Sequence, residues 1–277
     1  MTELILIPPQ SNALRSMNNR PPRTKLEHLR QLVEGKQLWS EPLSAEDEAK
    51  GFLGWHERGY LPHCDKPGLT QFVTFRLADS MPESRRGEWE HLLAASTPSD
   101  ARLESKHPRS DAPRSGAQSI ALREERDRAA RQQRIKLEAY LDRGLGECHL
   151  RDPNIAAWVE KAILHHHGRR FSILAWVVMP NHAHVLVEIW QTPLATVLQN
   201  WKSITAVEAN KILRRDGTFW QPEYWDRFMR DEEQVRKAIR YIENNPVKAG
   251  LCRTPEDWPF ASARYRDEKT PQLNLPA

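Results

Sequence analysis

Two apolar stretches on either side of a tight turn form the clearest pattern in the chain. Residues 171–179 are almost continuously apolar, residues 183–189 are rich in aliphatic side chains, and Pro180-Asn181 lies between them. This pattern predicts a β-hairpin whose first strand is buried on both faces. Residues 70–77 (TQFVTFRL) combine alternation with β-branched and aromatic side chains, and they predict a further strand.

Helical periodicity separates these strands. The pattern predicts helices over residues 154–166, 194–213 and 231–244. Asp152-Pro153 is a start signal for the first helix. Asp231 and Gln234 have the spacing of a capping box at the start of the third. Pro246 disfavours a helical residue before it, so the third helix is predicted to end near residue 244.

An aromatic stretch, residues 219–228 (FWQPEYWDRF), predicts one more strand before the last helix. Two strands are thus joined by a tight turn, and the others are separated by helices. This order favours an α+β fold in which a largely antiparallel sheet carries packed helices.

Composition shifts divide the chain into one main domain with appendages. Residues 1–59 are interpreted as an N-terminal arm, partly flexible because its early part is rich in Pro, Asn and Arg. Residues 60–267 form the domain, and residues 268–277 form a C-terminal tail. Within the domain, residues 96–119 are a polar insertion and residues 120–141 are predicted to be a basic helix.

Charge and cysteine content indicate which kind of partner and which cellular compartment to expect. The 277 residues carry a net charge of +4, and residues 101–136 alone hold ten Lys or Arg against five Asp or Glu. That excess weakly favours a polyanionic partner, although a segment of this kind is more often a solvated helix face. The longest apolar run, residues 173–179, is too short to cross a bilayer, and the first residues do not have the pattern expected of a secretory signal. Three widely spaced cysteines suit reduced thiols, so a cytoplasmic protein without membrane contact is expected.

The most specific candidate for chemistry is a pair of histidines at the start of the second hairpin strand. His182 and His184 are two residues apart, so in a strand both project from one face and can bind one cation together. The intervening and following apolar residues point the other way, into the core: Ala183, Val185, Val187 and Ile189. Two ordinary hydrogen-bonded histidines remain the alternative.

The last predicted helix adds a phenol and an amide beside its buried face. Its apolar stripe consists of Val235, Ala238, Ile239 and Ile242. Tyr241 borders that stripe, and Asn245 neighbours Tyr241 one turn later. Without other information, Tyr241 is also explained as an amphipathic residue at the edge of the core.

Other candidates have weaker patterns. The consecutive histidines at positions 165–167 would point about 100° apart on a helix, so a solvated helix end explains them better than a metal site. Tyr224 and Tyr265 are rival nucleophiles, but neither has an amide four residues later.

Four motifs occur together in one order: MPNHAH, WQPEYWDRFMRD, YIENNPVKAGL and WPFASARY. Over residues 60–265 the chain thereby resembles the REP-associated tyrosine transposases, which are relatives of the IS200-like single-strand transposases with an HUH motif. The resemblance implies a ferredoxin-like HUH nuclease core. It assigns metal binding to His182, His184 and Asn245, and the nucleophile to Tyr241.

The resemblance also implies an activity and partners. The expected protein is a metal-dependent endonuclease and strand transferase on single-stranded or hairpin DNA of the repetitive extragenic palindrome type, acting through a 5′-phosphotyrosine. Histidines alone suit zinc or manganese, whereas amide and phosphate oxygens suit Mg²⁺ or Mn²⁺, which the resemblance favours. Among the nearby cations, Arg240, Lys248 and Arg227 are the expected DNA contacts. A monomer is favoured over a dimer.

Two other functions remain open. A DNA-hairpin-binding protein without catalysis would keep the same residues. A nucleotide hydrolase of the histidine-triad type would share His182 and His184, but its third histidine position is Leu186 here. Such a hydrolase would not need Tyr241.

Overall fold

The computed structural model describes residues 42–58, 61–80, 144–266 and 273–275, and Pro42–Ala277 form one compact unit. Most of the predicted N-terminal arm, the 96–119 insertion and the basic helix at 120–141 lie outside the described residues. In the parts of the chain that are described, no helix is both long and apolar enough to cross a membrane.

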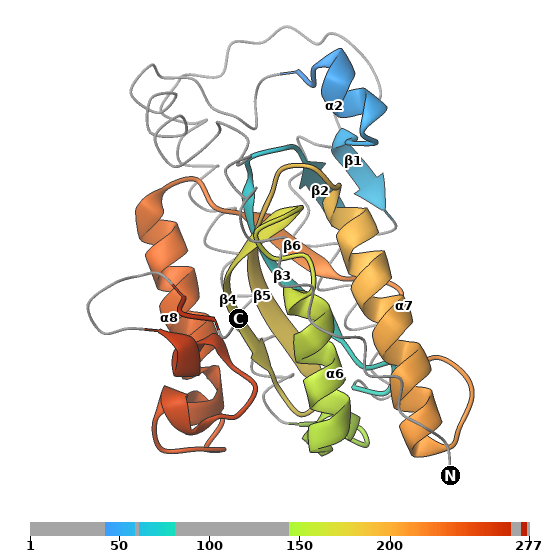
Figure 1. Ribbon diagram of the computed structural model, residues 1–277, viewed down its shortest axis with the longest axis vertical. Helices are drawn as coiled ribbons and strands as arrows, with labels where there is room; N and C mark the ends of the chain where they lie inside the picture. Colours follow the sequence, from blue (N-terminus) through green and yellow to red (C-terminus); the bar gives the residue numbers. More distant parts are fainter. Residues whose placement is uncertain (1–41, 59–60, 81–143, 267–272, 276–277) are drawn as a thin grey trace, which may run out of the picture. The chain divides into compact units, whose positions relative to one another are not determined.

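A four-stranded antiparallel sheet with the order β4-β5-β3-β6 forms the centre of the fold (Figure 1). The strands are β3 (Thr70–Arg76), β4 (Phe171–Val178), β5 (His182–Ile189) and β6 (Trp225–Phe228). The predicted hairpin is β4 and β5, closed by a bond from Met179 N to His182 O. Sheet and packed helices together confirm the α+β class.

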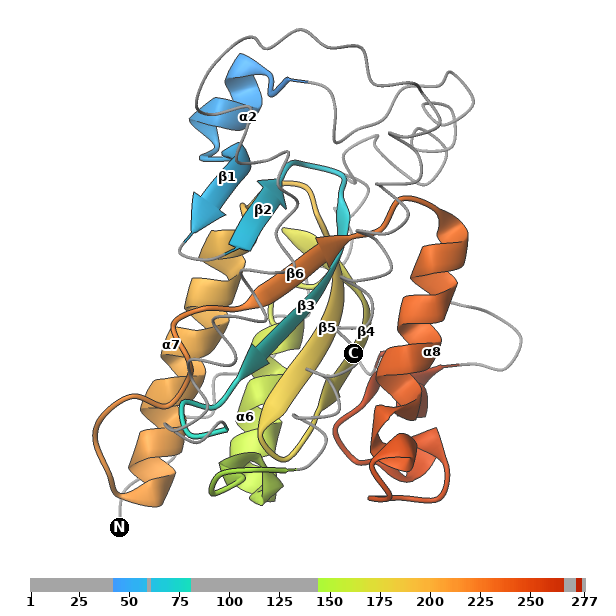
Figure 2. The ribbon, with the colours of Figure 1, turned by 180° about the vertical axis from the view of Figure 1, so that it is seen from behind.

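Helices cover both faces of this sheet. Helices α6 (Pro153–Leu164) and α7 (Leu194–Leu213) pack on one face, and α8 (Glu232–Lys248) packs on the other, as Figures 1 and 2 show. Strand β5 supplies both cores, since Val185 and Val187 belong to the α6/α7 side and Leu186 to the α8 side. The predicted alternation of β5 is therefore confirmed, and it directs the two histidines toward α8.

Local start signals account for the residues at which α6 and α8 begin. Asp152 caps α6 by accepting from Asn154 N, and Pro153 occupies the first turn, as predicted. Helix α7 has the predicted bounds. Asp231 caps α8 by accepting from Gln234 N, although Gln234 itself accepts from Arg230 N rather than from the cap residue.

The predicted end of the last helix is wrong. Helix α8 continues through Asn245 and Pro246 to Lys248. Pro246 removes the backbone donor that would bond to the carbonyl of Ile242, so the last turn of the helix forms in spite of a lost hydrogen bond. Both Asn245 and Pro246 are buried, so their packing against the sheet outweighs the local preference of a residue before proline.

The predicted strand at 219–228 is also only partly correct. Regular pairing covers Trp225–Phe228 alone, while Trp220 forms a single bridge to Leu77. Pro222 interrupts the stretch, because proline cannot donate to a sheet ladder. The aromatic residues before it are buried in the core, where Trp220 Nε1 donates to Thr205 Oγ1 at 2.8 Å.

A short helix and a hairpin that the sequence analysis did not predict precede the sheet. Helix α2 spans Ala45–Ala49, β1 spans Gly54–Arg58 and β2 spans Leu61–Asp65, so the hairpin extends to both sides of residue 60. It is anchored to β6, where His63 pairs with Asp226 and the Trp55 ring lies 5.7 Å from that of Phe228. Side-chain contacts thus attach this separate two-stranded sheet to β6 of the four-stranded sheet.

Candidate functional site

The two histidines of β5 form a buried pair on the sheet face that α8 covers. His182 and His184 are 0% and 1% exposed. Their ring centroids lie 4.6 Å apart, and the two Nε2 atoms are separated by 3.1 Å. A transition-metal bond to imidazole nitrogen is about 2.0–2.1 Å long, so one cation can contact both atoms. The side chains of His182 and His184 therefore meet on one face of β5, as predicted.

A second set of residues orients each ring. His182 Nδ1 donates to Asn181 Oδ1 at 2.7 Å, and the Asn181 amide is itself fixed by donating to Leu145 O. Thr74 Oγ1 lies 2.8 Å from His184 Nδ1. When both ring protons lie on Nδ1, both Nε2 atoms present lone pairs to the same small space, which is the arrangement that a shared cation requires.

Burial keeps both imidazoles in the form that binds metal. It lowers the pKa of His182 to about 3, and the nearby Arg76 guanidinium lowers it further. Burial also holds the pKa of His184 well below its usual range, with added effects from His182 and from the Lys248 ammonium. Both rings are therefore neutral at pH 7, as a metal ligand requires.

Helix α8 places Tyr241 against His184 and carries the buried Asn245 one turn later. The Tyr241 ring lies 5.6 Å from the His184 ring and 5.8 Å from that of Phe72, and its hydroxyl is buried. Asn245 is fully buried, and neither atom of its amide has a hydrogen-bond partner within the described residues. An unsatisfied buried amide is costly, so Asn245 suits a ligand that completes it.

A metal ion bound by the two histidines would need a third ligand of another residue type. In the described part of the chain, no three His, Cys, Asp or Glu side chains are grouped so that they could hold a metal ion. The Oδ1 atom of Asn245 provides an oxygen of the kind that hard divalent cations accept. The residues present thus fit a divalent ion held by two nitrogens and one amide oxygen.

The rival candidates lie elsewhere. Tyr224 and Tyr265 pack with the core on the α6/α7 side, where they contact His63 and Trp176 respectively. Leu186, at the position of the missing third histidine, is fully buried in the α8-side core. His167 Nδ1 accepts from Ile173 N, and His165 stacks near His166 at 4.3 Å.

The three cations expected to contact DNA are all exposed. Lys248 Nζ lies 5.7 Å from the centre of the Tyr241 ring, so it borders the candidate site. Arg227 pairs with Phe72 across β6 and β3, which puts it on the same sheet face as the histidines. Arg240 lies on α8 one residue before Tyr241, and its carbonyl accepts from Asn244 Nδ2.

One buried cation near the histidines escaped the sequence analysis. Arg76 is 8% exposed, faces His182 across β3 and β5, and donates to Ser80 Oγ at 3.1 Å. Thr74 occupies the corresponding position opposite His184. The alternation of residues 70–77 puts both on one strand face, but only the strand register shows which histidine each one meets.

The WPFASARY motif anchors α8 rather than supplying chemistry. Glu243 is buried, and its Oε1 accepts from Ser262 Oγ at 2.8 Å and from Arg266 Nε at 2.7 Å. Ser262 Oγ also accepts from Trp176 N on β4. These bonds tie the helix that carries Tyr241 to the sheet that carries the histidines.

Comparison with known proteins gives three findings. Residues 159–245 match the family of IS200-like transposases. A REP-associated tyrosine transposase of Escherichia coli (strain K12) is 35% identical over 101 residues, which are 36% of this chain and 58% of that protein. A putative REP-associated tyrosine transposase of Haemophilus influenzae (strain ATCC 51907 / DSM 11121 / KW20 / Rd) is 26% identical over 110 residues, which are 36% of this chain and 62% of that protein.

A solved structure of a REP-associated tyrosine transposase bound to a REP hairpin aligns with 76% of this chain and 84% of that chain. The sequence identity is 17% and the TM-score is 0.41. The two curated relatives are matched over less than two thirds of their lengths, and the family segment ends at Asn245 after including both histidines and Tyr241. Residues 159–245 are therefore similar to the IS200-like transposase family, and the chain resembles the REP-associated tyrosine transposases, as its motifs predict.

Proposed function

We propose that the protein is a divalent-cation-dependent endonuclease and strand transferase, a transposase that cuts single-stranded DNA through Tyr241. The observation that supports the proposal is that His182, His184 and Tyr241 lie together in one chain, with an unsatisfied buried amide one helical turn after the tyrosine. His182 and His184 present facing nitrogens, Tyr241 lies against His184, and the buried amide of Asn245 needs a partner. A purely structural role would not account for both the facing histidine nitrogens and the unsatisfied buried amide.

The chemistry follows from what each residue does. The Tyr241 oxygen attacks the phosphorus of the scissile phosphate and releases the phenolic proton to water. The bond from phosphorus to the 3′ oxygen breaks, and that oxygen takes up a proton, which leaves a free 3′-hydroxyl and a 5′-phosphotyrosine. Attack by another 3′-hydroxyl reverses the step and rejoins strands. A phenol with an ordinary pKa near 10 is a poor nucleophile, so it needs help from its surroundings.

His182, His184 and Asn245 would hold the metal, for which we propose Mg²⁺ or Mn²⁺. A bound divalent cation polarises the scissile phosphate and stabilises charge that develops on its oxygens. The neutral ligand set leaves the full charge of the ion available to the DNA.

We propose hairpin-forming single-stranded DNA of the repetitive extragenic palindrome type as substrate, in line with the names of the relatives. Lys248, beside the Tyr241 ring, is the best placed to contact a phosphate near the cut. Arg240 and Arg227 would contact the backbone farther along. Because the histidines and Tyr241 meet in one chain, a monomer is sufficient for the reaction.

The wild-type protein should form a covalent adduct with DNA that survives denaturation. A hairpin with randomised single-stranded flanks is incubated with the protein and Mn²⁺ and then separated under denaturing conditions. A label at the 3′ end of the DNA should move with the protein, whereas a 5′ label should appear on a free shorter strand. EDTA should abolish both products. Tight hairpin binding without any adduct would favour a protein that binds DNA but does not cut it.

Arg76 is proposed to hold the scissile phosphate. Replacing Arg76 with Gln should slow adduct formation roughly 10- to 100-fold, because a hydrogen bond to a charged group is worth about 1.5–3 kcal/mol. The affinity for Mn²⁺ should not fall, since the variant removes a positive charge beside the ion. Single-turnover rates at saturating DNA and metal test the first point, and titration calorimetry tests the second. Arg76→Lys, which keeps the charge, should recover part of the rate; a metal affinity lost in parallel with rate would indicate a structural role.

A further inference from the structure

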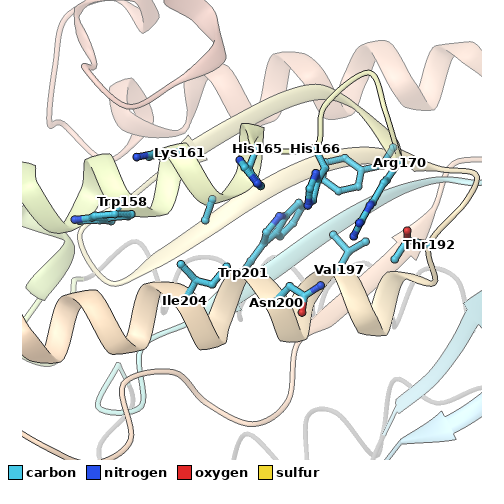
Figure 3. Close-up of a pocket in the computed structure, with 12 residues that line it drawn as sticks. Trp158, Lys161, His165, His166, Arg170, Thr192, Val197, Asn200, Trp201 and Ile204 are labelled. Atoms are coloured by element: carbon cyan, nitrogen blue, oxygen red, sulfur yellow. The ribbon is translucent and has the colours of Figure 1, made fainter. Parts of the chain in front are cut away.

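A groove separates α6 and α7 on the sheet face opposite the histidine pair. Its volume is about 260 Å³. Trp158 and Lys161 line it from α6, His165 lines it from the residue that follows α6, and Asn200, Trp201 and Ile204 line it from α7 (Figure 3). Residues three or four positions apart lie on one side of a helix, so each helix presents one face to the groove. The two helices thus form the two walls of the groove.

The floor of the groove is aromatic. Phe171 and Trp201 are 2% and 4% exposed and meet edge to face, with ring centroids 5.6 Å apart. Trp158 is only half-buried, and Lys161 Nζ lies 4.7 Å above its ring. Ile204 is 50% exposed at the rim. Part of the apolar surface of Trp158 and Ile204 is thus exposed to solvent beside the Lys161 ammonium, and a flat aromatic base could cover it.

One end of the groove carries a permanent cation, Arg170. His165, His166 and Arg170 line it there, with Arg169 next in the chain. The pKa of His166 is lowered by burial first and then by Arg170, His165 and Arg169, so every charged group that acts on this ring is basic. No Asp or Glu is among the described residues that line the groove. The nearby Glu160 instead accepts from Trp176 Nε1, away from the groove.

We propose that this groove is a second DNA contact, which binds an unpaired segment of single-stranded DNA. One base stacks on the partly exposed ring of Trp158, and Lys161 and Arg170 hold phosphates of the same segment. Aromatic surface combined with cations is the usual means of binding single strands, whereas paired bases have no free face to stack. The inference rests on the proposed function for the choice of DNA as ligand, but the groove takes no part in cutting.

The position of the groove determines the expected behaviour of variants. Because it lies across the sheet from Tyr241, it contributes to affinity and not to the chemical step. Trp158→Ala should weaken binding of a single strand roughly 5- to 100-fold, the range for losing one stacked base. Lys161→Gln combined with Arg170→Gln should lower the slope of log affinity against log salt by about 1.4, since each phosphate contact on a single strand contributes about 0.7.

The test uses the full chain carrying Tyr241→Phe, without metal, so that no cutting occurs. Fluorescence anisotropy measures binding of an oligothymidine and of a duplex of equal length over a range of salt concentrations. Lys211→Gln with Arg214→Gln, which removes two exposed charges from the far end of α7, is the matched control. An oligonucleotide containing iodouracil is also photo-crosslinked, and the modified residue is identified by mass spectrometry.

Weaker binding in the groove variants alone, preference for the single strand and a crosslink at Trp158 would support the inference. Equal binding by groove and control variants, or equal loss for the duplex, would overturn it and leave the groove to a protein partner. The inference and the proposed function can fail separately. A protein that crosslinks at Trp158 but never forms the covalent adduct keeps this contact and loses the endonuclease activity.

Discussion

Replacing Tyr241 with Phe is expected to reduce formation of the covalent DNA adduct by at least roughly 10⁴-fold, as removal of a nucleophile does elsewhere. The ring contacts of Tyr241 with His184 and Phe72 involve atoms that phenylalanine keeps. Folding and metal affinity should therefore change little, and only the attacking oxygen is lost. Denaturing electrophoresis of labelled DNA measures the adduct, and thermal unfolding with and without Mn²⁺ measures the other two properties.

Two matched variants separate Tyr241 from the other phenols. Tyr224→Phe and Tyr265→Phe alter rings that pack on the opposite side of the sheet, so both proteins should form the adduct at the wild-type rate. Persistence of the adduct in Tyr241→Phe would exclude Tyr241 as the nucleophile. Loss of the adduct in Tyr265→Phe alone would transfer that role to Tyr265.

The parts of the fold that sequence analysis predicted well depend on local periodicity. Helix α7 has the predicted bounds, and the alternation in β5 correctly assigned His184 and Val185 to opposite faces. The spacing of Tyr241 and Asn245 likewise predicted neighbours on one helix. Each of these features follows from repeats of two or of about 3.6 residues, which a single segment determines by itself.

The parts that were missed depend on contacts between distant segments. Thr74 meets His184 through a pairing of strands 110 residues apart, and no local pattern indicates that register. The β1–β2 hairpin is anchored by His63 and Asp226, which are 163 residues apart. Asn245 was expected beyond the helix because of Pro246, yet burial against the sheet retains it in α8. Tertiary packing outweighed a local preference in that case.

The side chains named at the candidate site are either neutral or positively charged. His182, His184, Asn245 and Tyr241 are neutral side chains, while Arg76 and Lys248 are the charged groups that act on the two rings. Adding a divalent cation makes the site more positive still. A DNA phosphate supplies the missing negative charge, so metal and substrate are expected to strengthen the binding of each other.

Replacing His184 with Ala is expected to weaken Mn²⁺ binding by at least about 100-fold, more than is typical when a residue that only orients a ligand is lost. The variant removes one of two nitrogens that lie 3.1 Å apart and replaces a buried polar ring with a small apolar side chain, so the metal-free protein should remain folded. Its melting temperature should then stay constant when Mn²⁺ is added, whereas that of the wild type should rise with metal concentration.

His165→Ala is the matched control, because His165 is a histidine in the groove across the sheet from the pair. This control should bind Mn²⁺ as the wild type does in titration calorimetry and show the same rise in melting temperature. Wild-type metal binding by His184→Ala would remove the histidine pair from the metal site. Loss of binding in both variants would instead place the ion at the end of α6. A loss confined to His184→Ala, together with loss of the DNA adduct, would link the buried pair to the chemistry of Tyr241.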